Sequence, residues 1–194
     1  MTTIRNYLLV AFGILIVLSF LDKLPYILFS GFGDKSIGQL KEVDLRDFNE
    51  IKKHVSQGYG SNAFALFAYI GGSHNGIDIS VESGAPIHSP ASGEIVATGN
   101  QDDFCYKRNY GKFLVLKTSD NYALLFAHLS KIKAGIGDKI EEGGIIGNVG
   151  VTGLATASHL HFTVFKKDSF LMGRRKDCGP NPEGQTMNPL GYLD

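Results

Sequence analysis

The stretch His159-Leu160-His161-Phe162 alternates polar and apolar side chains inside a predicted strand over residues 159–166. Because alternate residues of a strand share a face, the two histidines project from one side, while Leu160 and Phe162 point to the other. The apolar side then belongs to a protein core, and the polar side presents two imidazoles. This stretch therefore predicts β structure with one chemically functional face.

A second polar pair, His74 and Asp78, lies four residues apart in His74-Asn-Gly-Ile-Asp78. The same strand geometry projects both in one direction, while Ile77 and Ile79 point into a core. Imidazole nitrogen and carboxylate oxygen are good zinc ligands, and a catalytic zinc typically takes three protein ligands and a water. His74, Asp78 and one histidine of the first stretch would supply that set. A pair of surface residues that binds no metal also explains either pattern by itself.

Short apolar runs broken by glycine recur from Asn62 onward at the spacing that is typical of an all-β domain. The chain has 24 glycines and 6 prolines among 194 residues, which fits many tight turns. We therefore expect a mainly β fold. The predicted strands span residues 63–70, 76–81, 93–98, 112–118, 121–128, 145–149 and 159–166.

An uncharged apolar run covers Asn6–Leu21 near the start of the chain, and a second covers Leu24–Phe32. As a helix the first run reaches about 24 Å, and a terminal lysine can snorkel to cover the rest of a hydrocarbon core of about 30 Å. We expect an N-terminal transmembrane helix within residues 1–33. A cleaved signal peptide and a buried core helix are the alternatives. Arg5 favours an inside N-terminus, which would place the remainder of the chain outside the cytoplasm.

Residues 44–55 predict a short amphipathic helix that connects the anchor to the β domain. Its apolar face consists of Leu45, Phe48, Ile51 and Val55. The expected organisation is a membrane anchor over 1–33, a linker with this helix over 34–60, and the β domain over 61–194.

The charge balance argues against nucleic-acid binding, and the two cysteines raise the question of a disulfide. The 19 basic and 19 acidic residues give a formal net charge of zero, so the electrostatic case for a nucleic-acid binder is absent. Outside the cytoplasm a disulfide between Cys105 and Cys178 could persist, but two unpaired thiols fit the sequence as well.

Several familiar catalytic motifs are missing from the chain. There is no His-Glu-x-x-His, no Gly-x-Ser-x-Gly and no phosphate-binding Gly-Lys-Ser/Thr after the glycines of 143–153. His128, in Phe126-Ala-His-Leu-Ser130, ends an apolar strand. His54 and His88 have no partner nearby in the sequence, and we expect them to be structural or surface residues.

Taken together and in order, the motifs resemble those of the lysostaphin-type, or LytM-like, zinc metallopeptidases, which cut peptide cross-bridges in bacterial cell walls. The resemblance covers roughly residues 60–194, and it implies a compact, glycine-rich antiparallel β-sandwich or barrel-like metallopeptidase domain. The motifs that carry it are His74-x-x-x-Asp78, Gly84-Ala-Pro-Ile87, Ala91-Ser-Gly-Glu-Ile95, Tyr110-Gly111, Ala127-His-Leu-Ser130, Gly147-x-x-Gly150-x-Thr-Gly153, His159-Leu-His-Phe162 and Asn188-Pro-Leu-Gly-Tyr192.

The resemblance implies roles for five residues, none of which is replaced in this chain. His74, Asp78 and His161 match the ligands of one Zn2+ per chain. His128 and His159 match two further active-site histidines, which would move a proton or stabilise the oxyanion. By the resemblance, their presence speaks against the non-catalytic members of the family, which activate other wall hydrolases.

Two tyrosines could donate hydrogen bonds in the active site, and two segments could affect substrate preference. Tyr69 or Tyr110 could add to oxyanion stabilisation. The segments 101–109 and 166–185 depart from the pattern of the family, and each holds one cysteine. If the cysteines pair, they would tie together two loops at the border of the cleft.

The sequence therefore predicts a membrane-anchored, extracytoplasmic zinc endopeptidase that acts on peptidoglycan stem or cross-bridge peptides. Two alternatives remain. A non-catalytic scaffold or activator would act on a cell-envelope protein partner. A carrier-type module is suggested by Gly137-Asp-Lys-Ile140, but Lys139 lacks the flanking pattern of a modified lysine and the histidines would go unexplained.

Overall fold

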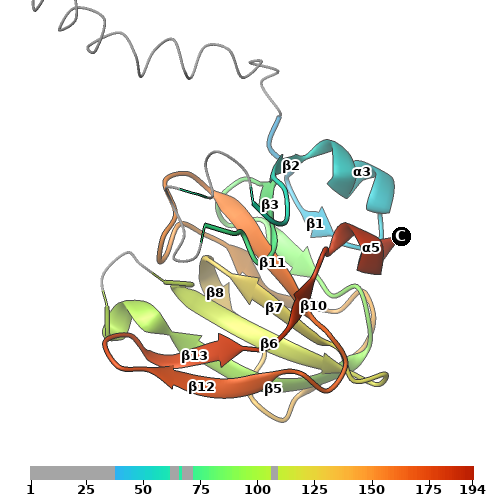
Figure 1. Ribbon diagram of the computed structural model, residues 1–194. Helices are drawn as coiled ribbons and strands as arrows, with labels where there is room; N and C mark the ends of the chain where they lie inside the picture. The colour runs from blue at the N-terminus through green and yellow to red at the C-terminus, as the bar shows by residue number, and fades with distance from the viewer. Residues whose placement is uncertain (1–37, 62–65, 67–71, 106–108) are drawn as a thin grey trace, which may run out of the picture. The chain divides into compact units, whose positions relative to one another are not determined.

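The computed structural model describes residues 38–61, 66, 72–105 and 109–194 (Figure 1). The expected membrane anchor at 1–33 lies outside the described residues, as does the predicted strand 63–70 apart from Leu66. Within the described part of the chain, no helix has the length and apolar character that crossing a membrane requires.

The larger of two main sheets has the strand order β2-β3-β11-β7-β6-β5-β9, with β14 beside β11, and neighbouring strands are antiparallel. Five of the predicted strands are confirmed here within a few residues. Its strands are β2 (Val55–Gln57), β3 (Ile77–Ser80), β5 (Gly93–Asn100), β6 (Lys112–Thr118), β7 (Ala123–Ala127), β9 (Lys139–Ile140), β11 (His159–Phe165) and β14 (Thr186–Met187).

The smaller sheet has the order β1-β4-β10-β8, in which only the pair β1–β4 is parallel. Its strands are β1 (Val43–Asp44), β4 (Pro86–His88), β8 (Leu129–Ile132) and β10 (Ile145–Val149). The predicted strand 145–149 is confirmed as β10. The other three were not predicted, because strands of two to four residues are too short to show a clear alternation.

The main core lies between these two sheets. The larger sheet contributes fully buried side chains that include Ile77, Ile79, Leu114, Phe126, Leu160 and Phe162. The smaller sheet contributes Val43, Ile87, Leu129, Ile146 and Val149. The apolar faces expected for the two histidine-bearing stretches are therefore confirmed, and so is the mainly β fold.

The connector helix is shorter than the predicted 44–55. Helix α3 spans Phe48–Lys53, and the Asp47 side chain caps it by accepting a hydrogen bond from the Glu50 backbone N–H. The flanking residues pair with strands instead, in β1 before the helix and β2 after it. Leu45 and Ile51 pack in the main core, so this segment is part of the sandwich. A second short helix, α5 (Leu190–Leu193), closes the chain.

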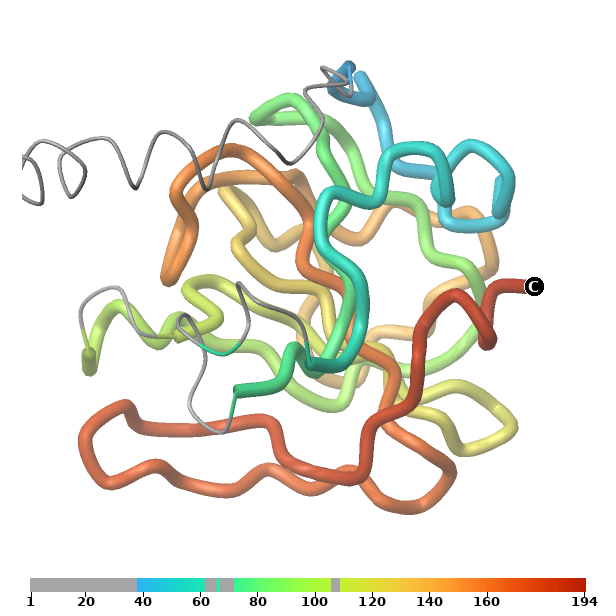
Figure 2. The backbone as a smooth tube through the Cα atoms, turned by 45° about the horizontal axis from the view of Figure 1, so that its top comes forward, coloured from blue at the N-terminus to red at the C-terminus, as the bar shows by residue number. Residues whose placement is uncertain are grey.

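A separate two-stranded sheet is formed by the hairpin of β12 (Leu171–Arg175) and β13 (Gly179–Glu183). Figure 2 shows it as the orange-red loop along one edge of the domain. Cys178, which directly precedes β13, forms a disulfide with Cys105, just after the short helix η1 (Gln101–Asp103). Both cysteines of the chain are therefore paired.

Removing this disulfide should destabilise the fold. The bridge joins residues 73 positions apart, so the double variant Cys105→Ala/Cys178→Ala is expected to lose about 2–4 kcal/mol of unfolding free energy as its unfolded state gains freedom. Urea unfolding of the full chain without reductant measures the difference. Adding reductant should lower the wild-type midpoint and leave that of the variant unchanged. Coincident midpoints of the two oxidised proteins would contradict the prediction.

Candidate metal centre

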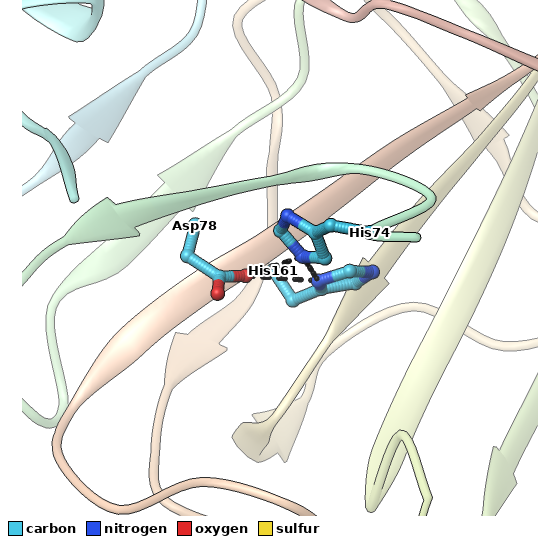
Figure 3. Close-up of side chains that lie close together, drawn as sticks. All are labelled: His74, Asp78 and His161. Atoms are coloured by element: carbon cyan, nitrogen blue, oxygen red, sulfur yellow. Dashed lines mark hydrogen bonds and ion pairs between the residues drawn. The ribbon is translucent and has the colours of Figure 1, made fainter. Parts of the chain in front are cut away.

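The pairing of β3 with β11 brings two of the predicted ligands together. These neighbouring strands are antiparallel, and their register sets Asp78 directly opposite His161. Cross-strand partners project from the same face of a sheet. Figure 3 shows the two side chains meeting beside His74. On the opposite face, Ile79 and Leu160 form the next pair in the core.

The spacing of His74 and Asp78 predicted that both lie on one strand, but the structure places His74 differently. It does not lie on β3 but precedes it, in an isolated bridge to Gly60. Its backbone N–H donates to the Gly60 carbonyl at 3.0 Å. Gly76 follows, so close to the backbone of Phe162 that a Cβ at this position would overlap it. The position of His74 therefore depends on its backbone bridge to Gly60 and on the close approach of Gly76 to Phe162, and not on strand alternation.

Three donor atoms meet at one point. His161 Nδ1 lies 2.9 Å from Asp78 Oδ1 and 3.0 Å from His74 Nε2, and His74 Nε2 lies 3.3 Å from Asp78 Oδ1. All three residues are buried. In a tetrahedral zinc site with bonds of about 2.0–2.1 Å, ligand atoms are about 3.3 Å apart. The three donor atoms are thus nearly as far apart as the ligand atoms of a zinc site.

The outer nitrogens of both imidazoles have partners that orient the rings. His74 Nδ1 lies 2.9 Å from the Gly58 carbonyl oxygen, and His161 Nε2 lies 2.9 Å from Thr163 Oγ1. With protons on these outer nitrogens, the inner nitrogen of each ring has a lone pair that could bind a metal ion, whereas an inner N–H would donate to the Asp78 carboxylate instead. The donor set therefore fits a divalent metal such as zinc.

The titration of the cluster reflects its burial and its mutual contacts. Burial alone would raise the pKa of Asp78, but hydrogen bonds with His161 and His74 outweigh it and hold that pKa well below its usual range. Burial lowers the pKa of His161, although Asp78 opposes the shift. The carboxylate is thus ionised at neutral pH and available as an anionic ligand.

His128 lies beside the cluster, between β7 and β8. Its φ of 61° is left-handed, which costs a non-glycine residue about 1 kcal/mol, and its backbone N–H donates to the Tyr110 carbonyl at 2.9 Å. Its Nδ1 lies 2.8 Å from the Thr152 carbonyl oxygen, which leaves Nε2 as an acceptor. Burial, with smaller contributions from His161 and His159, lowers the pKa of His128 to about 3.

His159 completes the group of five predicted residues. Its ring centroid is 4.7 Å from that of His128, and its Nε2 is 3.7 Å from Asp78 Oδ1. Its Nδ1 lies 2.9 Å from the Ala157 carbonyl oxygen. In contrast, His54, directly after α3, and His88 on β4 bond to the Glu50 and Gly143 carbonyls, in agreement with the structural roles expected for them.

Two further residues contact the site: Tyr110, which the sequence suggested as a donor, and Thr163, which it did not identify. Tyr110, one of the suggested donors, has its ring centroid 5.6 Å from that of His161, and its hydroxyl accepts a 2.6 Å hydrogen bond from Asn75 Nδ2. The other suggested donor, Tyr69, lies outside the described residues. Thr163 was missed as a partner of His161, although its position two residues along the same strand would have indicated a shared face.

Comparison with known proteins identifies the family to which the chain belongs. The model of peptidase family M23 matches residues 72–173, which is more than half of the 194 residues and includes all five site residues. The chain belongs to peptidase family M23. Lysostaphin is among the relatives and solved structures that match, so the lysostaphin-type family suggested by the ordered motifs is confirmed.

Curated relatives of this M23 chain include two bacterial endopeptidases. The glycyl-glycine endopeptidase ALE-1 of Staphylococcus capitis is 34% identical over 112 residues, which cover 56% of this chain and 29% of ALE-1. The peptidoglycan DD-endopeptidase ShyA of Vibrio cholerae is 36% identical over 89 residues, which cover 46% of this chain and 19% of ShyA. The chain therefore matches less than a third of the length of either relative.

A solved M23 structure agrees with the fold. The catalytic domain of lysostaphin from Staphylococcus simulans aligns with a TM-score of 0.58 at 28% identity, over 75% of this chain and 94% of that domain. The sandwich described above is therefore the fold of an M23 peptidase domain.

Proposed function

We propose that this chain is a zinc-dependent endopeptidase that hydrolyses peptide cross-links or stem peptides of bacterial peptidoglycan. The observation that carries the proposal is the convergence of His74 Nε2, Asp78 Oδ1 and His161 Nδ1 on one point, beside two further imidazoles. The name of ShyA, a peptidoglycan DD-endopeptidase, supports the substrate class, and ALE-1 is by its name a glycyl-glycine endopeptidase.

In this proposal His74, Asp78 and His161 hold one Zn2+ per chain. When bound, zinc supplies Lewis-acid chemistry, which polarises a peptide carbonyl and lowers the pKa of water. Two neutral imidazoles and one carboxylate leave the site with a net positive charge. The Gly58 carbonyl and Thr163 hydroxyl keep both ligand rings in the required orientation.

Proton transfer is assigned to His128 and His159. Both rings bond a backbone carbonyl through Nδ1, so the Nε2 atom of each ring is free of that bond and can exchange a proton. The Nε2 atom of one ring accepts a proton from the attacking water and then returns that proton to the leaving amine, while the other ring orients the water or, when protonated on Nε2, stabilises the oxyanion. Burial raises the pKa of Tyr110, which keeps its hydroxyl protonated as a further donor.

We also propose an extracytoplasmic location for the domain. The Cys105–Cys178 disulfide supports it, because such bridges persist mainly in oxidising compartments. The expected division is kept in this proposal, with a membrane anchor over 1–33, a connector over 34–60 and the peptidase domain over 61–194, although β1, α3 and β2 of the connector pack on the sandwich. Anchoring would confine the enzyme near its substrate.

Digestion of purified peptidoglycan by the full chain tests the proposed function. Released muropeptides are identified by mass spectrometry, with and without a zinc chelator, using walls with glycine cross-bridges and walls with direct cross-links. We expect new peptide termini that disappear with the chelator, and the termini identify the bond that is cut. No release from any wall by the zinc-loaded protein would favour an activator of another envelope hydrolase.

A further inference from the structure

Gln101 is a buried amide between the β12–β13 hairpin and the candidate metal centre. Its side chain is nearly inaccessible, at 1% exposure. The Nε2 group donates to the Pro180 carbonyl at 2.8 Å and to Asn181 Oδ1 at 3.2 Å, both on β13. The Oε1 atom accepts from the Tyr110 backbone N–H at 2.9 Å. One side chain therefore joins the hairpin to the segment that carries Tyr110.

Tyr110 in turn contacts two residues of the centre and the neighbour of a third. Its carbonyl accepts the His128 backbone N–H at 2.9 Å, its ring lies beside His161, and its hydroxyl bonds Asn75, which directly follows His74. A displacement of Tyr110 would therefore be transmitted to a metal-ligand ring and to a proton-transfer histidine.

The β12–β13 hairpin, which Gln101 connects to Tyr110, is itself held in place by the disulfide. Figures 1 and 2 place it along one edge of the domain, and the disulfide attaches the start of β13 to the turn after η1. The Asp102 carboxylate of η1 also accepts the Gly153 backbone N–H at 2.9 Å, next to Thr152, the partner of His128. The match to the family model ends at residue 173, so β13 lies beyond it.

We propose that Gln101 is a positioning residue, which couples the disulfide-tied hairpin to Tyr110 and so fixes the His128 and His161 rings. The inference rests on the proposed function for its effect on turnover. Replacing the buried amide with an apolar group of similar size removes the Gln101 partner of the Tyr110 N–H and of the Pro180 carbonyl, which belong to half-buried residues. Loss of an orienting partner at a metal site typically lowers activity by about 10–100-fold.

The test compares two variants of the full, zinc-loaded chain. Gln101→Met removes both ends of the amide connection, whereas Gln101→Glu retains an acceptor for the Tyr110 N–H. We expect kcat to fall about 10–100-fold in Gln101→Met with little change in KM, and to fall less in Gln101→Glu. The NMR signals of the His128 and His161 rings should shift in Gln101→Met.

Thr118→Val is the matched control. It also removes buried hydrogen bonds, at the far end of β6, about 20 Å along the strand from the Tyr110 segment. It should leave kcat and both ring signals unchanged, even if it lowers stability as much as Gln101→Met does.

Unshifted ring signals in Gln101→Met, or wild-type kcat in a folded Gln101→Met protein, would overturn the inference. Equal shifts in Thr118→Val would also overturn it, because they would indicate a general loss of stability. If the wild type hydrolyses no wall, the proposed function fails, while the ring signals still decide whether Gln101 positions the centre.

Discussion

His161→Ala is expected to abolish zinc binding and peptidoglycan hydrolysis together. His161 Nδ1 is the donor that lies within 3.0 Å of both other proposed ligand atoms, so its loss leaves two donors and an uncompensated carboxylate. The decrease in zinc affinity should exceed the roughly 10–100-fold that loss of an outer partner causes. Zinc content after gel filtration and muropeptide release from the same sample measure both effects.

His54→Ala is the control for that variant. His54 directly follows α3 and bonds the Glu50 carbonyl, outside the group of five residues, so its removal should preserve zinc content and turnover. Hydrolysis at the wild-type rate by His161→Ala would refute the ligand assignment.

His128→Asn is expected to lower turnover by about 10²–10⁴-fold while zinc stays bound. The His128 ring centroid is 5.7 Å from that of His161, and its nitrogens are not among the three converging donor atoms. Asparagine is the suitable replacement because it tolerates the left-handed backbone found at this position, with a φ of 61°. The variant should therefore fold with little added strain.

Turnover and zinc content of His128→Asn are measured on one preparation, beside its unfolding midpoint. Loss of zinc from a folded protein would mean that His128 is a ligand and not a proton-transfer group. Unchanged turnover would remove His128 from the proposed mechanism altogether.

The ordered motifs and the alternation in β11 allowed much of this site to be predicted from the sequence. His159 and His161 alternate with Leu160 and Phe162, so the strand, its faces and its core contacts follow from a period of two. The site residues come from separate segments, and the resemblance of their motifs to a family was needed to group them.

Other features depend on contacts that no local pattern records. The position of His74 is set by its bridge to Gly60, and that of Tyr110 by an amide of η1. The hairpin over residues 171–183 contains glycine and proline without apolar alternation, so its strands were not predicted. Both ends of the predicted helix 44–55 were lost to strand pairing, which tertiary structure decides.

The central claim, that one zinc held by His74, Asp78 and His161 makes this chain a peptidoglycan endopeptidase, is tested most directly by titrating metal-free protein with zinc. Muropeptide release is recorded at each addition with the full chain. The account predicts that activity is absent without metal, rises linearly and reaches its maximum at one zinc per chain. Hydrolysis that is already maximal in the metal-free protein, or none after one equivalent of zinc is bound, would contradict it.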